Sequence, residues 1–166
     1  FLHLFFNMLG LWMLGSSLEN MWGSKKFLYF FLSCTIGGSL FFLGYDAYLN
    51  YDAYQMFKQL SLSDQSAYLN ESNFIFNNIS LIGCSSGVFG CFVAFAYLNP
   101  EAIFYFYFIF PLKAKWILAI SIGLEFLFLF ISLPNDRSSH ISHLGGALIG
   151  FILVYTWYRN NKRRIF

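Results

Sequence analysis

Three histidines and a pair of adjacent serines are the side chains of this 166-residue chain best suited to proton transfer and nucleophilic attack. A serine hydroxyl becomes a nucleophile when a neighbouring imidazole takes its proton. Ser85 and Ser86 lie near the start of an apolar segment, where unpaired backbone N–H groups and the helix dipole favour a developing negative charge. His3, His140 and His143 lie near the starts of two other apolar segments. One of the serines is therefore a candidate nucleophile.

Each of these residues also has a structural interpretation. Serine hydroxyls cap helices or link neighbouring helices, and Asn7, four residues after His3 on the same helix face, could form an interhelical hydrogen bond. The chemical interpretation requires that helices come close together. Gly146 and Gly150 form a stripe of small residues just after His143, and such stripes let two helix backbones approach. This stripe could bring an imidazole against a serine on another helix.

The composition indicates a membrane protein. The chain is 58% hydrophobic and 11% charged, whereas a soluble domain carries roughly 25% charged residues. This excludes a soluble enzyme and a nucleic-acid binder. The odd set of Cys34, Cys84 and Cys91 lies within apolar runs and indicates reduced packing thiols. No spacing of histidine and cysteine matches a metal site, so we expect neither metal nor cofactor.

Charge-free apolar runs predict an all-α, polytopic membrane helix bundle that forms a single domain over residues 1–166. The polar stretch 46–75 is expected to be an outer loop, in part helical. The aromatic stretch 99–115 contains Pro100 and Pro111, which break a helix, so we expect an interfacial connection there. The five predicted spans are roughly 1–18, 27–45, 79–98, 116–133 and 141–158.

The basic residues predict the orientation of these spans. If five helices alternate, eight of the ten Lys and Arg residues fall on one side, which the positive-inside rule makes cytoplasmic. The C-terminus is then cytoplasmic, with the basic stretch 159–164 as its anchor, and all three histidines lie near the opposite face. Because the chain begins at that face without a starting Met, we expect a further helix upstream. A bacterial plasma membrane is the expected location.

Four stretches of the sequence resemble the rhomboid family of intramembrane serine proteases. His3 to Asn7 is similar to the family's His-x-x-x-Asn motif, and residues 11–28 resemble the helix end and turn that follow it. "GCSSGVFG" (83–90) resembles the Gly-x-Ser-Gly nucleophile motif. "HLGGALIG" (143–150) resembles the last helix, with the catalytic histidine before the glycine stripe.

The resemblance implies a six-helix core, of which five helices are present here. It also implies an intramembrane serine endopeptidase whose partners are transmembrane protein substrates and the lipid bilayer. Ser85 would attack the scissile carbonyl and His143 would act as the base. The oxyanion would be held by the Ser85 backbone N–H and by the side chains of His3 and Asn7.

The nucleophile motif departs from the family pattern and leaves two registers open. Taking Ser85 keeps Gly83 two positions earlier and puts Phe89 where the family tends to carry an aromatic that stacks on the imidazole, but Ser86 replaces the second glycine. Taking Ser86 keeps Gly87 but loses the first glycine and the aromatic. We favour Ser85, because a change from glycine to serine is small.

No Asp or Glu is expected beside either histidine at the outer face. Glu125 lies mid-span and Glu19 lies near the cytoplasmic end, so the sequence predicts a Ser–His dyad whose imidazole is oriented by packing, with Phe89 as the candidate. His140 is the rival base, one helical turn nearer the surface. Two other functions stay open: a catalytically inactive rhomboid-like protein that binds membrane clients, and a small channel or transporter.

Overall fold

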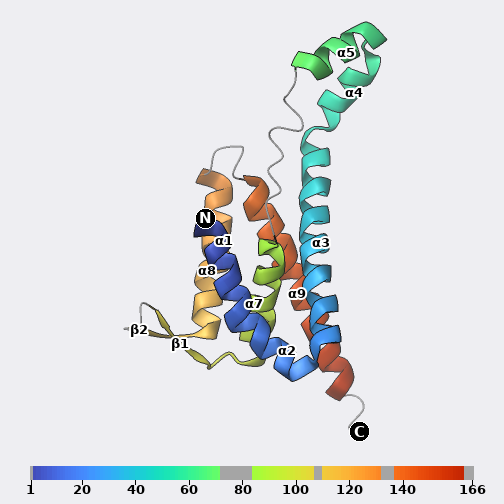
Figure 1. The fold of residues 1–166 in the computed structure, drawn as a ribbon. Coiled ribbons are helices and arrows are strands. Elements are labelled where there is room, and N and C mark those ends of the chain that lie inside the picture. Colours follow the sequence, from blue (N-terminus) through green and yellow to red (C-terminus); the bar gives the residue numbers. More distant parts are fainter. Residues whose placement is uncertain (1, 72–83, 107–109, 132–136, 163–166) are drawn as a thin grey trace.

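The computed structural model describes residues 2–71, 84–106, 110–131 and 137–162, and it confirms the helical membrane bundle (Figure 1). Three of its helices are long and apolar enough to cross a membrane within these residues: α3, α8 and most of α9. The protein is therefore an integral, multi-pass membrane protein. The helices are α1 (Leu2–Gly10), the π-helical turn η1 (Leu11–Gly15), α2 (Ser16–Trp22), α3 (Ser24–Leu49), α4 (Tyr51–Gln59), α5 (Leu62–Glu71), α7 (Ser85–Leu98), α8 (Ala114–Ile131) and α9 (Arg137–Lys162).

The first predicted span is longer than expected and consists of α1, η1 and α2 in succession. It ends at Gly23, whose φ of +80° is unfavourable for any residue with a side chain. The Gly23 N–H donates to Glu19 O at 2.7 Å, and Phe27 N–H donates to Gly23 O at 3.0 Å. This turn joins α2 directly to α3.

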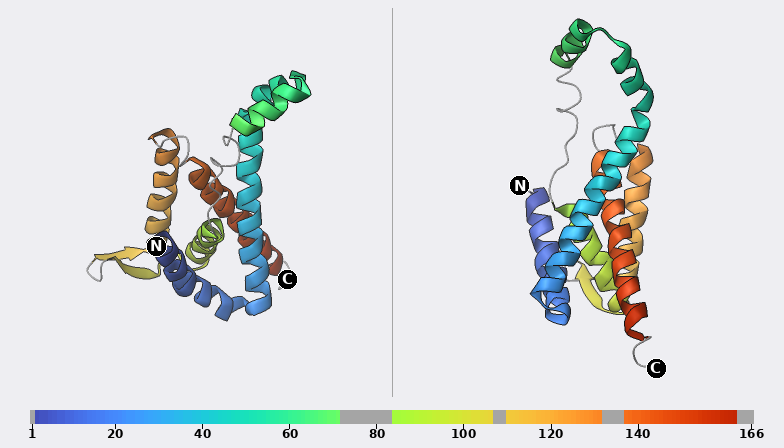
Figure 2. Two further views of the ribbon diagram at one scale, coloured as in Figure 1. Left: turned by 45° about the horizontal axis from the view of Figure 1, so that its top comes forward. Right: turned by 90° about the vertical axis from the view of Figure 1, so that its right-hand side faces the viewer.

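Helix α7 lies at the centre of the bundle, with α3 and α9 packed against it (Figures 1 and 2). Glycines make this close packing possible. A Cβ added at Gly146 would lie 2.2 Å from the carbonyl oxygen of Ser86, and one added at Gly150 would lie 2.8 Å from the Cα of Gly90. The glycine stripe of α9 therefore lies against α7, as the sequence pattern suggested.

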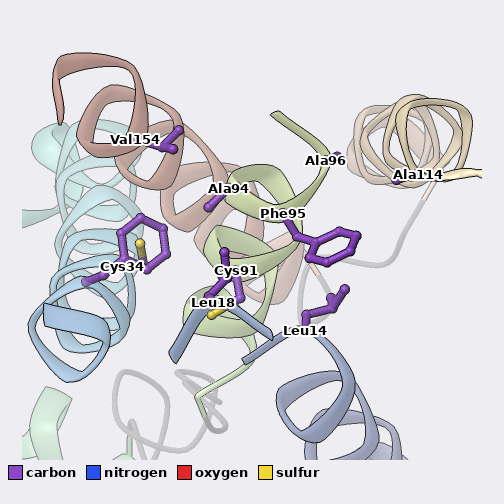
Figure 3. Close-up of a cluster of buried hydrophobic side chains, with 10 residues drawn as sticks. Leu14, Leu18, Cys34, Cys91, Ala94, Phe95, Ala96, Ala114 and Val154 are labelled. Atoms are coloured by element: carbon purple, nitrogen blue, oxygen red, sulfur yellow. The ribbon is translucent and has the colours of Figure 1, made fainter. Parts of the chain in front are cut away.

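The hydrophobic core surrounds the C-terminal half of α7, from Cys91 onward (Figure 3). Leu14 reaches it from η1 and Leu18 from α2, and Cys34 and Val154 reach it from α3 and α9. Cys34 and Cys91 are buried free thiols, in agreement with a packing role. Its buried members are Leu14, Leu18, Phe30, Cys34, Cys91, Ala94, Phe95, Ala96, Ala114 and Val154.

The turn between α2 and α3, the connection before α8 and the end of α9 all lie at one end of the bundle (Figure 1). There the Trp22 and Trp157 rings pack edge to face with centroids 5.4 Å apart, and Lys26 Nζ lies 4.3 Å from the Trp157 ring centroid. Three basic clusters thus fall at the same end of the molecule: Lys25 and Lys26, Lys113 and Lys115, and Arg159 near the end of α9.

The connection 99–115 contains a feature that the sequence did not predict. Strands β1 (Ile103–Phe106) and β2 (Phe110–Lys113) form an antiparallel pair. Tyr105 pairs with Pro111, and because the sheet has two strands within the part of the chain that the structure describes, Pro111 lies on an edge where the missing N–H is tolerated. Proline does end the helical structure here, but the residues around it pair as strands.

The predicted outer loop 46–75 is largely helical within the residues that the structure describes. Helix α3 continues to Leu49, past the predicted span end, and α4 and α5 follow it. These two short helices project beyond the other helices of the bundle (Figures 1 and 2). Residues 72–75 of that loop and 79–83 of the third predicted span lie outside the described residues.

Candidate active site

A serine and a histidine from two neighbouring helices meet where α7 begins. Ser85 is the first residue of α7, and its Oγ lies 2.8 Å from Nε2 of His143 on α9. Both side chains are buried, with exposed fractions of 7% and 9%. The Phe89 ring stacks on the His143 imidazole with centroids 4.4 Å apart and an interplanar angle of 11°. This geometry suits proton transfer from a hydroxyl to an imidazole.

Ser86 points elsewhere. Its Oγ donates a hydrogen bond to Thr35 O on α3 at 3.4 Å, and the residue is 1% exposed. Ser86 packs against glycines of two helices, Gly38 of α3 and Gly146 of α9. A Cβ added at Gly38 would lie 2.6 Å from Ser86 Cβ, and Gly146 lies against the Ser86 carbonyl. Ser86 thus occupies the contact between helices, while Ser85 faces the imidazole.

A carboxylate lies beside both histidines of α9, and the expectation that none would do so is wrong. Glu125 of α8 is buried, with Oε1 2.9 Å from His143 Nδ1 and Oε2 2.6 Å from His140 Nδ1. The arrangement Ser85–His143–Glu125 has the connectivity of a catalytic triad. His140, the rival base in the sequence, directs its Nδ1 to Glu125, whereas His143 reaches Ser85.

No carboxylate was expected beside His143 because the last span was predicted to begin at residue 141, whereas α9 begins at Arg137 and so places His143 deeper in the bundle. Glu125 lies six residues before the end of α8 at Ile131, and His143 lies six residues after the start of α9 at Arg137. The two side chains are therefore at the same level of an antiparallel helix pair. A sequence signal existed: an ionisable residue in an apolar span is costly unless it has a partner, and Glu125 is the only charged residue in 116–133.

Glu125, His140 and His143 are also the residues, within the described part of the chain, whose donor atoms cluster tightly enough to hold a metal ion. Their oxygen–nitrogen separations of 2.6 and 2.9 Å are hydrogen-bond lengths. Two tetrahedral ligands of Zn²⁺ at 2.0–2.1 Å would lie about 3.3 Å apart. The observed geometry fits shared protons better than a shared metal.

The structure describes two of the three predicted oxyanion donors, the Ser85 backbone N–H and Asn7. The Ser85 backbone N–H belongs to the first turn of α7, ahead of the first bond of the helix, from Val88 N–H to Cys84 O. A Cβ at Gly10 of α1 would lie 2.9 Å from Val88 Cγ1, so these two residues lie side by side. Asn7 and Ser85 each lie three residues earlier on their helices, so they are near the same level. The His3 side chain and Gly83 lie outside the described part of the structure.

Residues 1–160 match a family described as the Rhomboid domain. No solved structure gives a significant match.

Three curated proteins are similar to this chain. RHOMBOID-like protein 12, mitochondrial, of Arabidopsis thaliana is 28% identical over 98% of this chain and 43% of its own length. Rhomboid protein 1, mitochondrial, of Saccharomyces cerevisiae is 29% identical over 95% of this chain and 38% of its own length. Rhomboid protease GluP of Bacillus subtilis is 27% identical over 90% of this chain and 22% of its own length. The chain spans less than half the length of each of these relatives.

Proposed function

We propose, from the premise that this chain belongs to the rhomboid family, that it is an intramembrane serine endopeptidase with Ser85 as its nucleophile and His143 as its general base. The observation that carries the proposal is the 2.8 Å contact between Ser85 Oγ and His143 Nε2, with Phe89 stacked on the imidazole. The similarity to a bacterial protein named as a rhomboid protease supports it.

The reaction begins when Ser85 Oγ attacks the scissile carbonyl carbon and its proton passes to His143 Nε2. The carbonyl oxygen becomes an oxyanion, which the Ser85 N–H and the side chains of His3 and Asn7 stabilise. One such donor typically lowers the barrier by roughly 2.7–4 kcal/mol. The imidazolium then protonates the leaving amine as the C–N bond breaks. In the second half of the reaction, water loses a proton to His143 and attacks the acyl group, and His143 returns that proton to Ser85 Oγ as the acyl bond breaks.

The substrates would be transmembrane segments of other proteins. A transmembrane helix hides its carbonyls within its own hydrogen bonds, so it must unwind locally before Ser85 can attack. Small or helix-breaking residues near the cut are therefore expected. The site lies toward the end of the bundle opposite the three basic clusters, so cleavage near the corresponding membrane face is expected.

The comparisons bear on which membrane contains this protein. The sequence pointed to a bacterial plasma membrane, but two of the three relatives are named as mitochondrial, so the comparisons do not support a bacterial location. We propose only the relative orientation, with the basic end of the bundle on the side where α9 ends and the active site near the other face.

The proposal is tested by reconstituting the purified protein in liposomes with a fluorescently tagged single-span protein that carries Gly and Pro residues near one face. Cleavage by the wild-type protein, lost in Ser85→Ala and in His143→Ala and retained in Ser86→Ala, is the expected result. If the folded wild-type protein binds this substrate without cleaving it, the alternative of an inactive client-binding protein holds. Cleavage that survives Ser85→Ala would exclude Ser85 as the nucleophile.

A further inference from the structure

The carboxylate of Glu125 makes two separate hydrogen bonds to two imidazoles. Oε1 lies 2.9 Å from His143 Nδ1, and Oε2 lies 2.6 Å from His140 Nδ1. The two histidines lie one turn apart on α9, and their rings meet edge to face with centroids 6.5 Å apart. One residue of α8 thus links two consecutive turns of α9.

With Glu125 ionised, the hydrogen-bond pattern indicates where the protons lie. An ionised carboxylate only accepts hydrogen bonds, so Nδ1 of each imidazole must be the donor. His143 then carries its proton on Nδ1 and presents the lone pair of Nε2 to the Ser85 hydroxyl, 2.8 Å away. This is the tautomer that a general base needs, because the opposite tautomer would place a proton where the serine proton must go.

We propose that Glu125 is a positioning residue for His143, which holds the imidazole in this tautomer and orientation, and that His140 holds the carboxylate in place. The inference rests on the proposed function. When Ser85 forms its bond to the carbonyl carbon, its proton moves to Nε2, and Glu125 stays ionised while it accepts the hydrogen bond from Nδ1. The proton leaves with the amine, so Glu125 neither gains nor loses one.

The role of His140 follows from the cost of burying a charge. A carboxylate in an apolar helix bundle is destabilising unless its oxygens receive hydrogen bonds. His143 supplies one donor, and His140 supplies the other. The His140 ring lies against Phe128, one turn after Glu125, with centroids 5.4 Å apart. His140 therefore contacts two residues of α8, Glu125 and Phe128. Its hydrogen bond holds Oε2 of Glu125 in place, so that Oε1 faces His143.

The first test compares Glu125→Gln and Glu125→Asp with the wild-type protein, each shown to be folded by thermal denaturation. Gln presents an NH₂ group to one of the imidazoles and so favours the wrong tautomer. We expect kcat to fall by at least about 100-fold in Glu125→Gln, with KM within about twofold. Glu125→Asp keeps the charge but shortens the reach, so an intermediate loss is expected. The control Glu101→Gln removes a carboxylate outside the site and should leave kcat within about twofold.

The second test separates the two donors of the carboxylate. Asn places its amide nitrogen where the Nδ1 of a histidine lies, so His140→Asn can still donate to Oε2, whereas His140→Leu cannot. His140→Leu should lower kcat about tenfold, and His140→Asn should retain most of it. Equal losses in both variants would overturn the role of His140.

A third measurement does not depend on activity or on variants that may not fold. In the ¹⁵N-histidine-labelled wild-type protein, the His143 resonances should show a protonated Nδ1 and an unprotonated Nε2. A protonated Nε2 on neutral His143 would overturn the inference even if cleavage is confirmed, and so would wild-type kcat in Glu125→Gln. Activity that is lost to a chelator and restored by Zn²⁺ would make the cluster a metal site instead. A wild-type protein that never cleaves, but shows the expected tautomer, would refute the proposed function and leave the hydrogen-bond assignment intact.

Discussion

The His143 imidazole is held on three sides by residues from two other helices. Ser85 and Phe89 of α7 contact Nε2 and the ring face, and Glu125 of α8 contacts Nδ1. Each contact restrains a different motion: stacking restrains tilt of the ring, and the two hydrogen bonds restrain its rotation. At the scale of single residues, the site is thus already shaped for proton transfer before any substrate enters.

The stacked ring gives a prediction for Phe89. Phe89→Leu keeps an apolar side chain of similar size but removes the flat surface under the imidazole. Aromatic stacking is typically worth about 0.5–1.5 kcal/mol, so kcat should fall roughly two- to tenfold. Phe89→Tyr keeps the ring and should stay near wild type. Steady-state cleavage kinetics check this, and equal activity in the Leu and Tyr variants would show that stacking does not orient His143.

Residue types and spacing indicated a serine of the pair 85–86 and a histidine, and the resemblance to the rhomboid family implied Ser85, His143 and the stacking role of Phe89. The distinction between Ser85 and Ser86 could not be made from types alone, because adjacent helical residues differ by only 100° in direction. Their different partners, His143 and Thr35, depend on how α3 and α9 pack on α7. Glu125 was missed because the sequence placed the start of the last helix at residue 141, whereas α9 begins at Arg137 and brings His143 to the level of Glu125.

At the scale of helices, the catalytic distance depends on close packing between α7 and α9. Gly146 and Gly150 allow backbone contact one and two turns below His143. Any side chain at Gly146 would push against the backbone of Ser86, the residue after the candidate nucleophile. The stripe therefore serves both the fold and the site.

This packing predicts that Gly146→Ala is both destabilising and inactivating. The new Cβ would lie 2.2 Å from Ser86 O, and overpacking of this kind typically costs about 1–3 kcal/mol. Gly123→Ala on α8 is the matched control, because a Cβ there would have no atom within 4 Å. Melting temperatures in detergent should fall for the first variant and stay within a few degrees for the second. A Gly146→Ala protein with wild-type stability and cleavage would contradict the packing described here.

The connection between α7 and α8 predicts a pH dependence. Lys113 and Lys115 both donate hydrogen bonds to Glu101, and they lower the pKa of that carboxyl from its ordinary value of 4.5 to about 2. Because the folded-state pKa is depressed, this stabilisation is present above about pH 4.5 and is lost as the pH falls toward about 2. An NMR titration of Glu101 should show this low midpoint, which should rise in a Lys113→Gln, Lys115→Gln double variant. A wild-type midpoint near 4.5 would show that the two ion pairs do not form.

Helices were easier to predict than their ends. The apolar runs indicated where each helix lies, but α3 continues past the last apolar residues to Leu49 because a helix need not end where the membrane does. Pro111 was a correct signal, because the described residues between Leu98 and Ala114 contain no helix. The pairing of β1 with β2 could not be inferred, since a proline is compatible with a turn as well as with an edge strand.

At the scale of the whole molecule, the bundle has two different ends. The basic clusters and the Trp22–Trp157 contact lie at one end, and the connection from α3 to α4 lies at the other (Figure 1). Ser85, the first residue of α7, and His143, six residues into α9, place the site in the half of the bundle away from the basic clusters.

The projecting helices α4 and α5 give a prediction at this scale. None of the residues of α4 is buried, and both helices extend away from the bundle (Figure 2). Replacing residues 51–71 with a Gly–Ser linker of equal length should leave the melting temperature unchanged and kcat/KM within about twofold. If the replacement abolishes cleavage of a transmembrane substrate while Ser85 stays reactive, these helices recognise substrate.

The central claim is that Ser85 is a nucleophile activated by His143. The most direct measurement is reaction of the protein in detergent with a fluorophosphonate, followed by mass spectrometry to locate the adduct. We predict a single adduct on Ser85, which persists in Ser86→Ala and disappears in His143→Ala. An adduct on Ser86, or a folded protein that forms none, would contradict the assignment.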